Sequence, residues 1–301
     1  MTNNKYYLEI KTIQATAFKV LIEALKELLI DTYIIFDDTG MKIFTVDTAH
    51  VVIIHLKLKA SEFEHYYCEK SFSIGVNMIN FHKVIKTINN GDTLTLFIDK
   101  SDMNATPIPA QTHDDKHNNL GMNYLGIRIE NGQKNTKTTY KLDLYDLDVP
   151  EQIHIEPIEY NSIITMPSSD FQKIVRDMSN IAQEVEIKNI DNHLIFSCKG
   201  DFCFQETVLT DSPAASPDTM DATPSSGDVF DGKKNKVIIY NKNLDKITQG
   251  IFNLRYLVVF TKCTNLSNTV ELSLQNNLPL IVQYNIASLG TITLANAPTL
   301  R

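Results

Sequence analysis

Tryptophan is absent from this 301-residue chain, and glycine (11 residues) and cysteine (4 residues) are scarce. Neither the GxxxxGK[ST] phosphate-binding loop nor the GxGxxG dinucleotide-binding loop occurs, which argues against nucleotide-hydrolysing enzymes of the common type. The GxSxG, HExxH and SxxK arrangements of hydrolases are also missing. The motif search therefore favours a protein that is not an enzyme.

Long apolar runs are lacking as well. No stretch approaches the roughly 20 residues that span a bilayer, and the first residues have no apolar core of a signal peptide. We therefore expect an intracellular protein that makes no membrane contact. The cysteines stand at irregular spacings without a CxxC pair, so we expect free, mostly buried thiols and neither a disulfide nor a zinc site.

Basic residues are outnumbered by acidic ones. The 28 Lys and Arg residues stand against 36 Asp and Glu residues, which gives a formal net charge of −8. On bulk charge alone, this balance argues against a protein that coats nucleic acid. Hydrophobic residues make up 43% of the chain, enough for an ordinary core, and the length predicts about two domains.

Most of the sequence alternates apolar and polar residues in short runs, which predicts β-strands joined by hairpins. The runs are 33–38, 41–47, 51–58, 93–99, 125–130 and 138–144, then 184–190, 193–197, 202–209, 237–241, 269–274, 279–285 and 291–294. Four stretches have apolar residues three and four apart and predict helices: 16–30, 78–88, 168–181 and 254–262. The expected fold class is α+β, with two helices packed on one face of antiparallel sheets in each half.

The predicted elements recur after about half the chain, which indicates a duplication at domain scale. We expect an N-terminal domain at 1–145, a connector at 146–159 that has neither helical nor strand period, and a C-terminal domain at 160–301. Two polar segments, 101–119 and 211–234, interrupt the pattern and predict surface loops.

Candidate catalytic and metal-binding groups are weak. His113 and His117 stand four apart, but their Gln, Thr and Asn neighbours favour a solvated loop over a metal site. His65 and Cys68 fall in a strand, where residues three apart point to opposite faces. Asp37 precedes a turn, where a carboxylate commonly makes local hydrogen bonds. We expect no catalytic residue, no metal and no cofactor.

The outer faces of the four predicted helices carry cations in a regular pattern. Each helix contributes two, placed away from its apolar stripe: Lys19 and Lys26, Lys83 and Lys86, Lys173 and Arg176, and Arg255 and Lys262. On a single helix such a pair belongs to a solvated face with i,i+4 partners. Recurrence on all four helices favours a surface for nucleic-acid phosphates. The cations have no aromatic residues between them, which suits loose phosphate contact better than base readout or stacking.

Six groups of residues follow one another along both halves of the chain. They are Phe18–Lys26, Asp47–Val51, Leu144–Val149, Met166–Phe171, Leu254–Leu257 with Phe260–Lys262, and Leu278–Tyr284. Together they resemble the proliferating cell nuclear antigen (PCNA) family of DNA sliding clamps, over nearly the whole chain outside the two polar loops. The added loops and the Asn- and Ile-rich composition point to a divergent member from a large DNA virus.

The resemblance implies two similar clamp domains per chain and three chains closed into a ring around double-stranded DNA. The eight helix cations would line the hole and contact phosphates without regard to sequence. Neighbouring chains would join edge to edge, Thr138–Tyr145 of one against Phe202–Leu209 of the next. Such a ring tethers a DNA polymerase and other replication and repair proteins, in the nucleus or at a cytoplasmic replication site.

Partners of the family dock a short apolar and aromatic motif in a pocket under the connector. The matching positions here are Val46, His50, Val51, Ile153, Ile155, Pro279, Ala297 and Pro298. This chain has Asn296 before Ala297, where the family usually has a leucine, and Pro150 lengthens the connector. We therefore expect a shallower pocket or a preference for a different peptide.

Three alternatives remain open from the sequence. The first is a monomeric or dimeric processivity factor of similar fold, which would hold DNA by charge and not by enclosure. The second is a scaffold that has lost DNA contact, and the most remote is a metal-dependent enzyme using His50, His113 or His117. The mass of the protein in solution separates the first from the ring.

Overall fold

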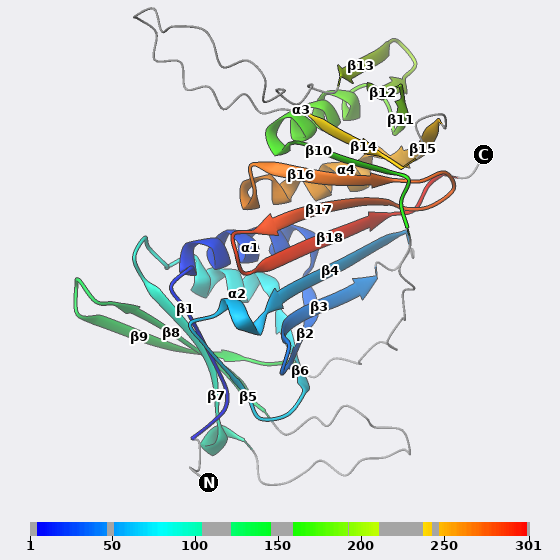
Figure 1. Cartoon of the computed structure of the whole chain (residues 1–301). Helices are drawn as coiled ribbons and strands as arrows, with labels where there is room; N and C mark the ends of the chain where they lie inside the picture. The colour runs from blue at the N-terminus through cyan, green and yellow to red at the C-terminus, as the bar shows by residue number, and fades with distance from the viewer. Residues whose placement is uncertain are drawn as a thin grey trace, which may run out of the picture.

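The computed structural model describes residues 5–46, 51–103, 122–145, 159–191, 193–210, 237–242 and 247–299. Within these ranges the chain forms eighteen β-strands in three antiparallel sheets and four α-helices (Figure 1). The predicted α+β class is confirmed. The two polar loops fall almost entirely outside the described residues.

The two halves of the chain contain the same elements in the same order: a strand, a helix, five strands, a helix and three strands. The first half has β1 (Tyr6–Thr12), α1 (Ala15–Leu28), β2 (Asp31–Asp37), β3 (Gly40–Val46), β4 (Val52–Lys59), β5 (His65–Cys68), β6 (Phe72–Asn77), α2 (Met78–Ile85), β7 (Thr93–Asp99), β8 (Tyr124–Asn131) and β9 (Thr136–Asp143). The second half has β10 (Ser162–Pro167), α3 (Ser168–Ser179), β11 (Glu184–Ile190), β12 (His193–Lys199), β13 (Phe204–Thr210), β14 (Ile238–Asn241), β15 (Thr248–Asn253), α4 (Leu254–Phe260), β16 (Thr269–Leu274), β17 (Leu280–Ile286) and β18 (Gly290–Asn296). This order agrees with the duplication inferred from the sequence.

Each half divides its strands into a set of five and a set of four. In the first half these sets are β5-β1-β7-β8-β9 and β4-β3-β2-β6, and in the second half they are β14-β10-β16-β17-β18 and β13-β12-β11-β15. Strand β18 pairs with β4, with Leu294 opposite Ile54, and so joins five strands of the second half to four of the first. The nine-stranded sheet that results runs across both halves (Figure 1).

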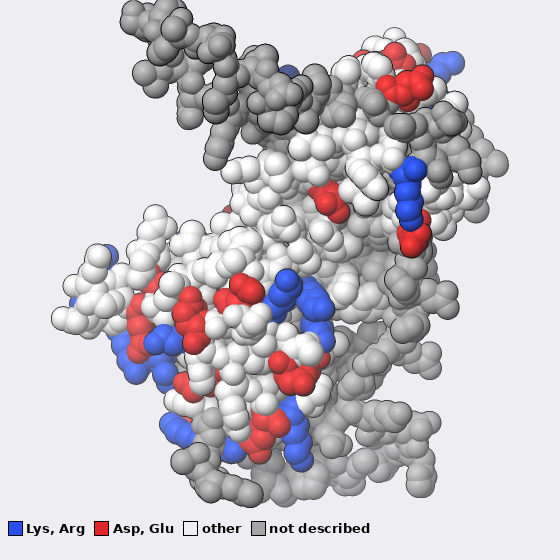
Figure 2. Space-filling model, in the orientation of Figure 1, with Lys and Arg blue, Asp and Glu red and all other residues white. Residues whose placement is uncertain are grey.

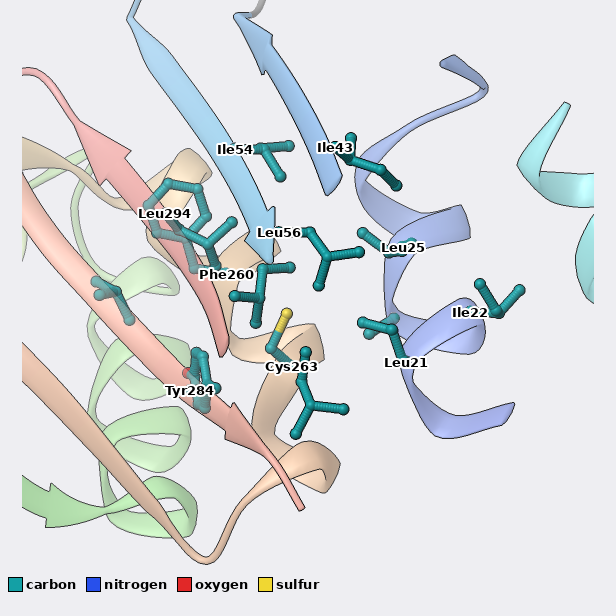
Figure 3. Close-up of a cluster of buried hydrophobic side chains, with 14 of the residues drawn as sticks. Leu21, Ile22, Leu25, Ile43, Ile54, Leu56, Phe260, Cys263, Tyr284 and Leu294 are labelled. Atoms are coloured by element: carbon teal, nitrogen blue, oxygen red, sulfur yellow. The ribbon is translucent and has the colours of Figure 1, made fainter. Parts of the chain in front are cut away.

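The helices form one layer behind this sheet, and the two halves share a hydrophobic core. Helix α1 packs against α2 and also against η3, the 3₁₀ helix Thr261–Leu266 of the second half. Figure 3 shows side chains from both halves meeting in this region: Leu21, Ile22 and Leu25 of α1, Ile43, Ile54 and Leu56 of the first half, and Phe260, Cys263, Tyr284 and Leu294 of the second. Burial raises the pKa of the Cys263 thiol to about 12, so this cysteine stays protonated and acts as a small apolar side chain.

Several boundaries differ from those predicted. Helix α1 ends at Leu28 and not at residue 30, because the chain turns extended at Leu29 and the carbonyl of Ile30 accepts a hydrogen bond from Met78. Strands β1, β6, β10 and β15 lie outside the predicted strands. Strand β6 is buried at four of its six positions and therefore lacks the alternation that marks a half-buried strand.

The β2–β3 turn forms as its sequence predicts. The Asp37 carboxylate accepts hydrogen bonds from the backbone N–H groups of Thr39 and Gly40. Gly40 has φ +142°, and a Cβ there would lie 1.9 Å from the carbonyl oxygen of Leu58. Only glycine fits this position.

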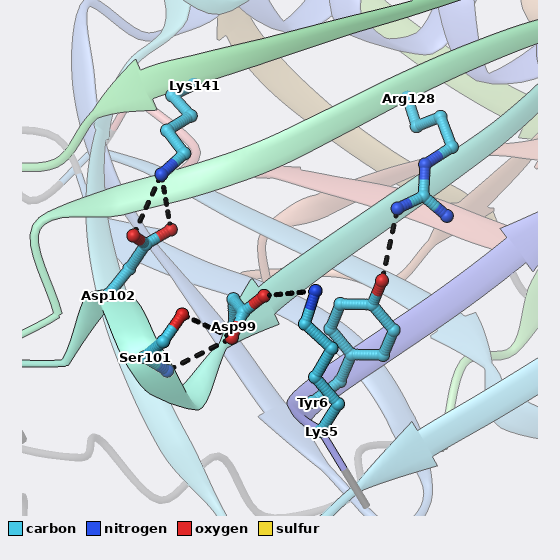
Figure 4. Close-up of polar contacts among 7 residues, drawn as sticks. All are labelled: Lys5, Tyr6, Asp99, Ser101, Asp102, Arg128 and Lys141. Carbon is cyan, nitrogen blue, oxygen red and sulfur yellow. Dashed lines mark hydrogen bonds and ion pairs between the residues drawn. The ribbon is translucent and has the colours of Figure 1, made fainter.

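Ion pairs fix one end of the five-stranded sheet (Figure 4). Lys5 lies 2.9 Å from Asp99, and Lys141 of β9 lies 2.7 Å from Asp102. Burial alone would raise the pKa of Asp99, but hydrogen bonds from Lys5 and Ser101 outweigh it and hold this pKa at about 2. The carboxylate is therefore charged at neutral pH, and β1, β7 and β9 are tied together there.

Candidate nucleic-acid interface and partner-peptide pocket

The eight predicted DNA-contacting cations all lie on the helical layer. Six of them are exposed: Lys83, Lys86, Lys173, Arg176, Arg255 and Lys262. The same helices carry four carboxylates, Glu23, Glu27, Asp170 and Asp177. Because the eight cations outnumber the four carboxylates, this layer carries a net positive charge, although the net charge of the chain is −8.

Two of the eight cations are partly buried and have protein partners. The Lys19 ammonium donates a hydrogen bond to the carbonyl oxygen of Ile88 at 2.8 Å, just beyond the end of α2. Its charge therefore stabilises the C-terminal end of that helix. Lys26 lies 3.6 Å from Glu27, and its side chain is 24% exposed.

The position of Lys262 differs from the prediction. Helix α4 ends at Phe260, and Lys262 lies in η3 and not in an α-helix. Thr261 and Cys263 on either side of it are buried, whereas Lys262 is exposed. The residue therefore keeps the solvent-facing placement that phosphate contact requires.

Lysines at α1 and at the end of α2 both lower the pKa of the His82 imidazole. Burial is the main cause that lowers the pKa of His82, and Lys26 of α1 lowers it further. Glu23 opposes this shift, and Lys86 and Glu27 have smaller effects of opposite sign. The sequence shows His82 beside two lysines of its own helix but cannot show the approach of Lys26, which depends on how α1 packs on α2.

The predicted partner-peptide pocket is only partly described. Val46, Val51, Pro279, Ala297 and Pro298 lie at one end of the nine-stranded sheet, all partly exposed. The N–H of Ala297 donates to the carbonyl oxygen of Val51 at 2.9 Å, so the last residues of the chain meet the start of β4. His50, Ile153 and Ile155 lie outside the described residues.

A residue that sequence reasoning missed supports the same end of the sheet. The hydroxyl of Tyr160 donates a hydrogen bond to the carbonyl oxygen of Pro279 at 3.1 Å. Tyr160 follows the connector, so this bond ties the start of the second half to a pocket residue. No local sequence pattern signals it, because the two residues are 119 positions apart.

The sequence of the chain matches known domains over most of its length. Residues 7–133 match the N-terminal domain of proliferating cell nuclear antigen, and residues 154–224 and 225–299 match its C-terminal domain. The chain belongs to the PCNA family. It is also 30% identical, over 304 residues that cover all of both proteins, to "Probable DNA polymerase sliding clamp 1" of Paramecium bursaria Chlorella virus 1. The prediction of a divergent, viral PCNA-family sliding clamp is confirmed.

This clamp buries an amide without a described partner at the end of β18. Asn296, the last residue of β18, is fully buried, and neither its side-chain nitrogen nor its oxygen has a hydrogen-bond partner among the residues that the structure describes. An unpaired buried polar group costs about 1–3 kcal/mol. Leucine has nearly the same shape and needs no partner.

We therefore expect Asn296→Leu to raise the free energy of unfolding by about 1–3 kcal/mol, because the desolvation cost disappears. Urea denaturation followed by circular dichroism measures the change. Asn296→Ala is the control, since it removes the amide but leaves a void, and we expect it to gain less. A loss of stability in Asn296→Leu would mean that the amide is paired in solution.

Neither a membrane helix nor a metal cluster is found in the described part of the chain. None of its helices is long and apolar enough to cross a membrane. It holds no group of three or more His, Cys, Asp or Glu residues placed to bind a metal ion. His113 and His117 lie outside the described residues.

Proposed function

We propose that three copies of this clamp close into a ring around double-stranded DNA and hold a DNA polymerase and other replication and repair proteins on it. Each chain would contribute two clamp domains, 1–145 and 160–301, linked by the connector 146–159. The observation that supports this proposal is that the two strands at free sheet edges, β9 and β13, correspond in position to β18 and β4, the two strands that pair between the halves of one chain.

The junction inside the chain is the pairing of β18 with β4. Strand β9 ends the five-strand set of the first half, as β18 ends the five-strand set of the second half. Strand β13 ends the four-strand set of the second half, as β4 ends the four-strand set of the first half. Strand β9 ends its sheet, as does β13, with no neighbour on the outer side among the described residues. If β9 of one copy pairs with β13 of the next, the contact between chains repeats the contact inside the chain. Such a head-to-tail contact closes into a ring of three when each copy is rotated by a third of a turn from the last.

The side chains of the two edges suit this pairing. Strand β13 exposes Phe204 (62%) and Val208 (48%), an apolar surface that is unusual on a free edge strand. It also carries Glu206, while β9 carries Lys137 and Lys141. Pairing the edges would cover the apolar residues and bring opposite charges together.

The helical layer would then face the hole. Cations from both halves would meet DNA phosphates there, while the surplus of acidic residues would lie elsewhere on the ring and repel DNA. Because enclosure keeps the ring on the duplex, each contact can be weak and exchangeable, which permits sliding. This arrangement uses charge and topology, and we assign it no catalytic step and no cofactor.

The pocket residues at the end of the nine-stranded sheet would hold the apolar motif of partner proteins. Val51 and Ala297 are joined by a backbone hydrogen bond and remain partly exposed, so they can offer apolar surface. We place the clamp at the site of DNA replication inside the cell.

Solution mass and retention on circular DNA test the ring. Sedimentation should give about three times 34.1 kDa. Clamps loaded onto a closed circle should stay bound at high salt and leave when the circle is cut once. A clamp that is held by enclosure cannot leave a closed circle, but it slides off a free end. A persistent monomer, or release that ignores the cut, would instead support a factor that holds DNA by charge.

A further inference from the structure

The outer face of the nine-stranded sheet, opposite the helices, changes its chemistry along the strands. Strand pairing sets its outward residues in rows across β3, β4, β18 and β17. Starting from the pocket, the rows are Val51, Ala297 and Pro279; then Val46, Ile53, Ala295 and Ile281; then Phe44, His55, Thr293 and Gln283; then Lys42, Lys57, Thr291 and Asn285. The surface therefore passes from apolar to cationic within four rows.

The cationic end is formed by lysines at alternate positions of β4 and by one of β3. Lys57 and Lys59 are exposed and make no ion pair within the part of the chain that the structure describes. Lys42 is partly exposed, and its ammonium lies 2.6 Å from the Asp37 carboxylate. We call Lys42, Lys57 and Lys59 the β3–β4 lysine patch.

His55 lies between the pocket and this patch. Its ring meets that of Phe44 edge to face, with centroids 5.9 Å apart. Burial is the main cause that lowers the pKa of His55, and Lys57 and Lys42 lower it further. The lysines therefore impose a positive potential beyond their own side chains.

Among the described residues no carboxylate lies on β3, β4, β17 or β18, and Asp37 at the end of β2 pairs with Lys42 of the patch. Glu271 belongs to β16, opposite Gln283 of β17, on the other side of β18. Figure 2 shows blue side chains over β3 and β4 and a broad uncharged surface over β17 and β18. On β3 and β4 themselves the only Lys, Arg, Asp or Glu residues are the three lysines Lys42, Lys57 and Lys59.

We propose that the partner-peptide site continues along β4 onto the β3–β4 lysine patch and selects peptides with acidic residues on one flank of the apolar anchor. This inference rests on the proposed pocket. The occupant is an acidic peptide because the patch adjoins apolar surface and because Lys57 and Lys59 have no carboxylate partner among the described residues. Val51 and Lys57 are six residues apart on one strand, about 20 Å at 3.3 Å per residue, so the acidic residues stand about six positions from the anchor in an extended peptide.

Fluorescence anisotropy with synthetic peptides tests the proposal on the full-length clamp. The peptides share one apolar and aromatic anchor and carry aspartates, serines or lysines about six residues away, on either side in separate peptides. We expect one aspartate peptide to bind about tenfold more tightly than its serine version at low salt, with the gain lost at high salt. The lysine version on that side should bind more weakly than serine.

The double variant Lys57→Glu and Lys59→Glu should reverse this preference. Its control is Lys11→Glu with Lys70→Glu, an equal charge change on exposed residues outside the nine-stranded sheet, which should keep the wild-type preference. Circular dichroism checks that both variants fold. A variant with unaltered preference would overturn the proposal.

The outcomes separate this inference from the pocket itself. A serine-flanked peptide that binds no better than one with its anchor replaced by serines would refute the pocket, and the inference with it. A serine-flanked peptide that binds, with no preference among flanks, would refute only the acidic extension. If the double variant loses retention on circular DNA but keeps the peptide preference, the patch contacts DNA and the proposal is wrong.

Discussion

Replacing Lys26, Lys86, Arg176 and Lys262 together by glutamate is expected to abolish the stimulation of a DNA polymerase on long templates. The four residues come from different parts of the helical layer, so every stretch of the proposed hole loses attraction and gains repulsion. Binding should also become less sensitive to salt, because the slope of log K against log salt falls by about 0.9 for each lost phosphate contact. The measurement is product length on a primed single-stranded circle, at several salt concentrations.

Lys19 is left out of this variant because its ammonium is bonded to the Ile88 carbonyl and its loss would disturb α2. The matched control reverses Lys11, Lys70, Lys134 and Lys199, which are exposed, make no ion pair among the described residues and give the same change in net charge away from the helices. We expect the control to keep long products. Equal loss in both variants would mean that total charge matters and that the helices have no special role.

Disrupting the β13 edge should have the second large effect. The double variant Glu206→Lys and Val208→Lys replaces an apolar contact and sets lysines against Lys137 and Lys141 of β9. We expect each interface to lose about 2 kcal/mol, and a ring of three contains three such interfaces. The protein should therefore sediment near 34.1 kDa and lose retention on circular DNA while remaining folded.

Ile238→Lys on β14 provides the control for this variant. It also places a lysine at an exposed apolar position of a sheet edge, since Ile238 is 57% exposed, but β14 lies outside the proposed contact. This variant should stay assembled. A β13 variant that keeps the wild-type mass would contradict the proposed pairing of β9 with β13.

The sequence predicts the helices well because the buried residues of each helix follow a spacing that can be recognised within a short stretch of chain. Phe18, Leu21, Ile22 and Leu25 stand at helical spacing, and all four are buried. Strand β15 escapes prediction because Gly250 interrupts its pattern. That glycine leaves room for the ring of Phe252, since a Cβ there would lie 2.5 Å from the ring.

The candidate site also has features that the sequence predicts and features that depend on the packing of distant elements. The helix cations are predicted by spacing on single elements, and they do lie on the helical layer. The bond from Lys19 to Ile88 and the approach of Lys26 to His82 require the packing of α1 on α2, which no local pattern encodes. Lys57 and Lys59 alternate on one strand and could be assigned to an outward face, but their relation to Ala297 depends on the pairing of β18 with β4.

The repeated order of elements in the two halves bears on how a ring would move along DNA. Two similar halves in each of three chains would present six similar pairs of helices to the duplex, whereas the double helix repeats every 10–10.5 base pairs. Six does not divide that repeat, so the phosphates and the protein charges cannot all be in register at once. When the ring moves by one base pair, some contacts between lysines and phosphates would strengthen while others weaken, so the energy barriers to movement along the DNA would be small. Duplication of the domain would therefore favour fast sliding.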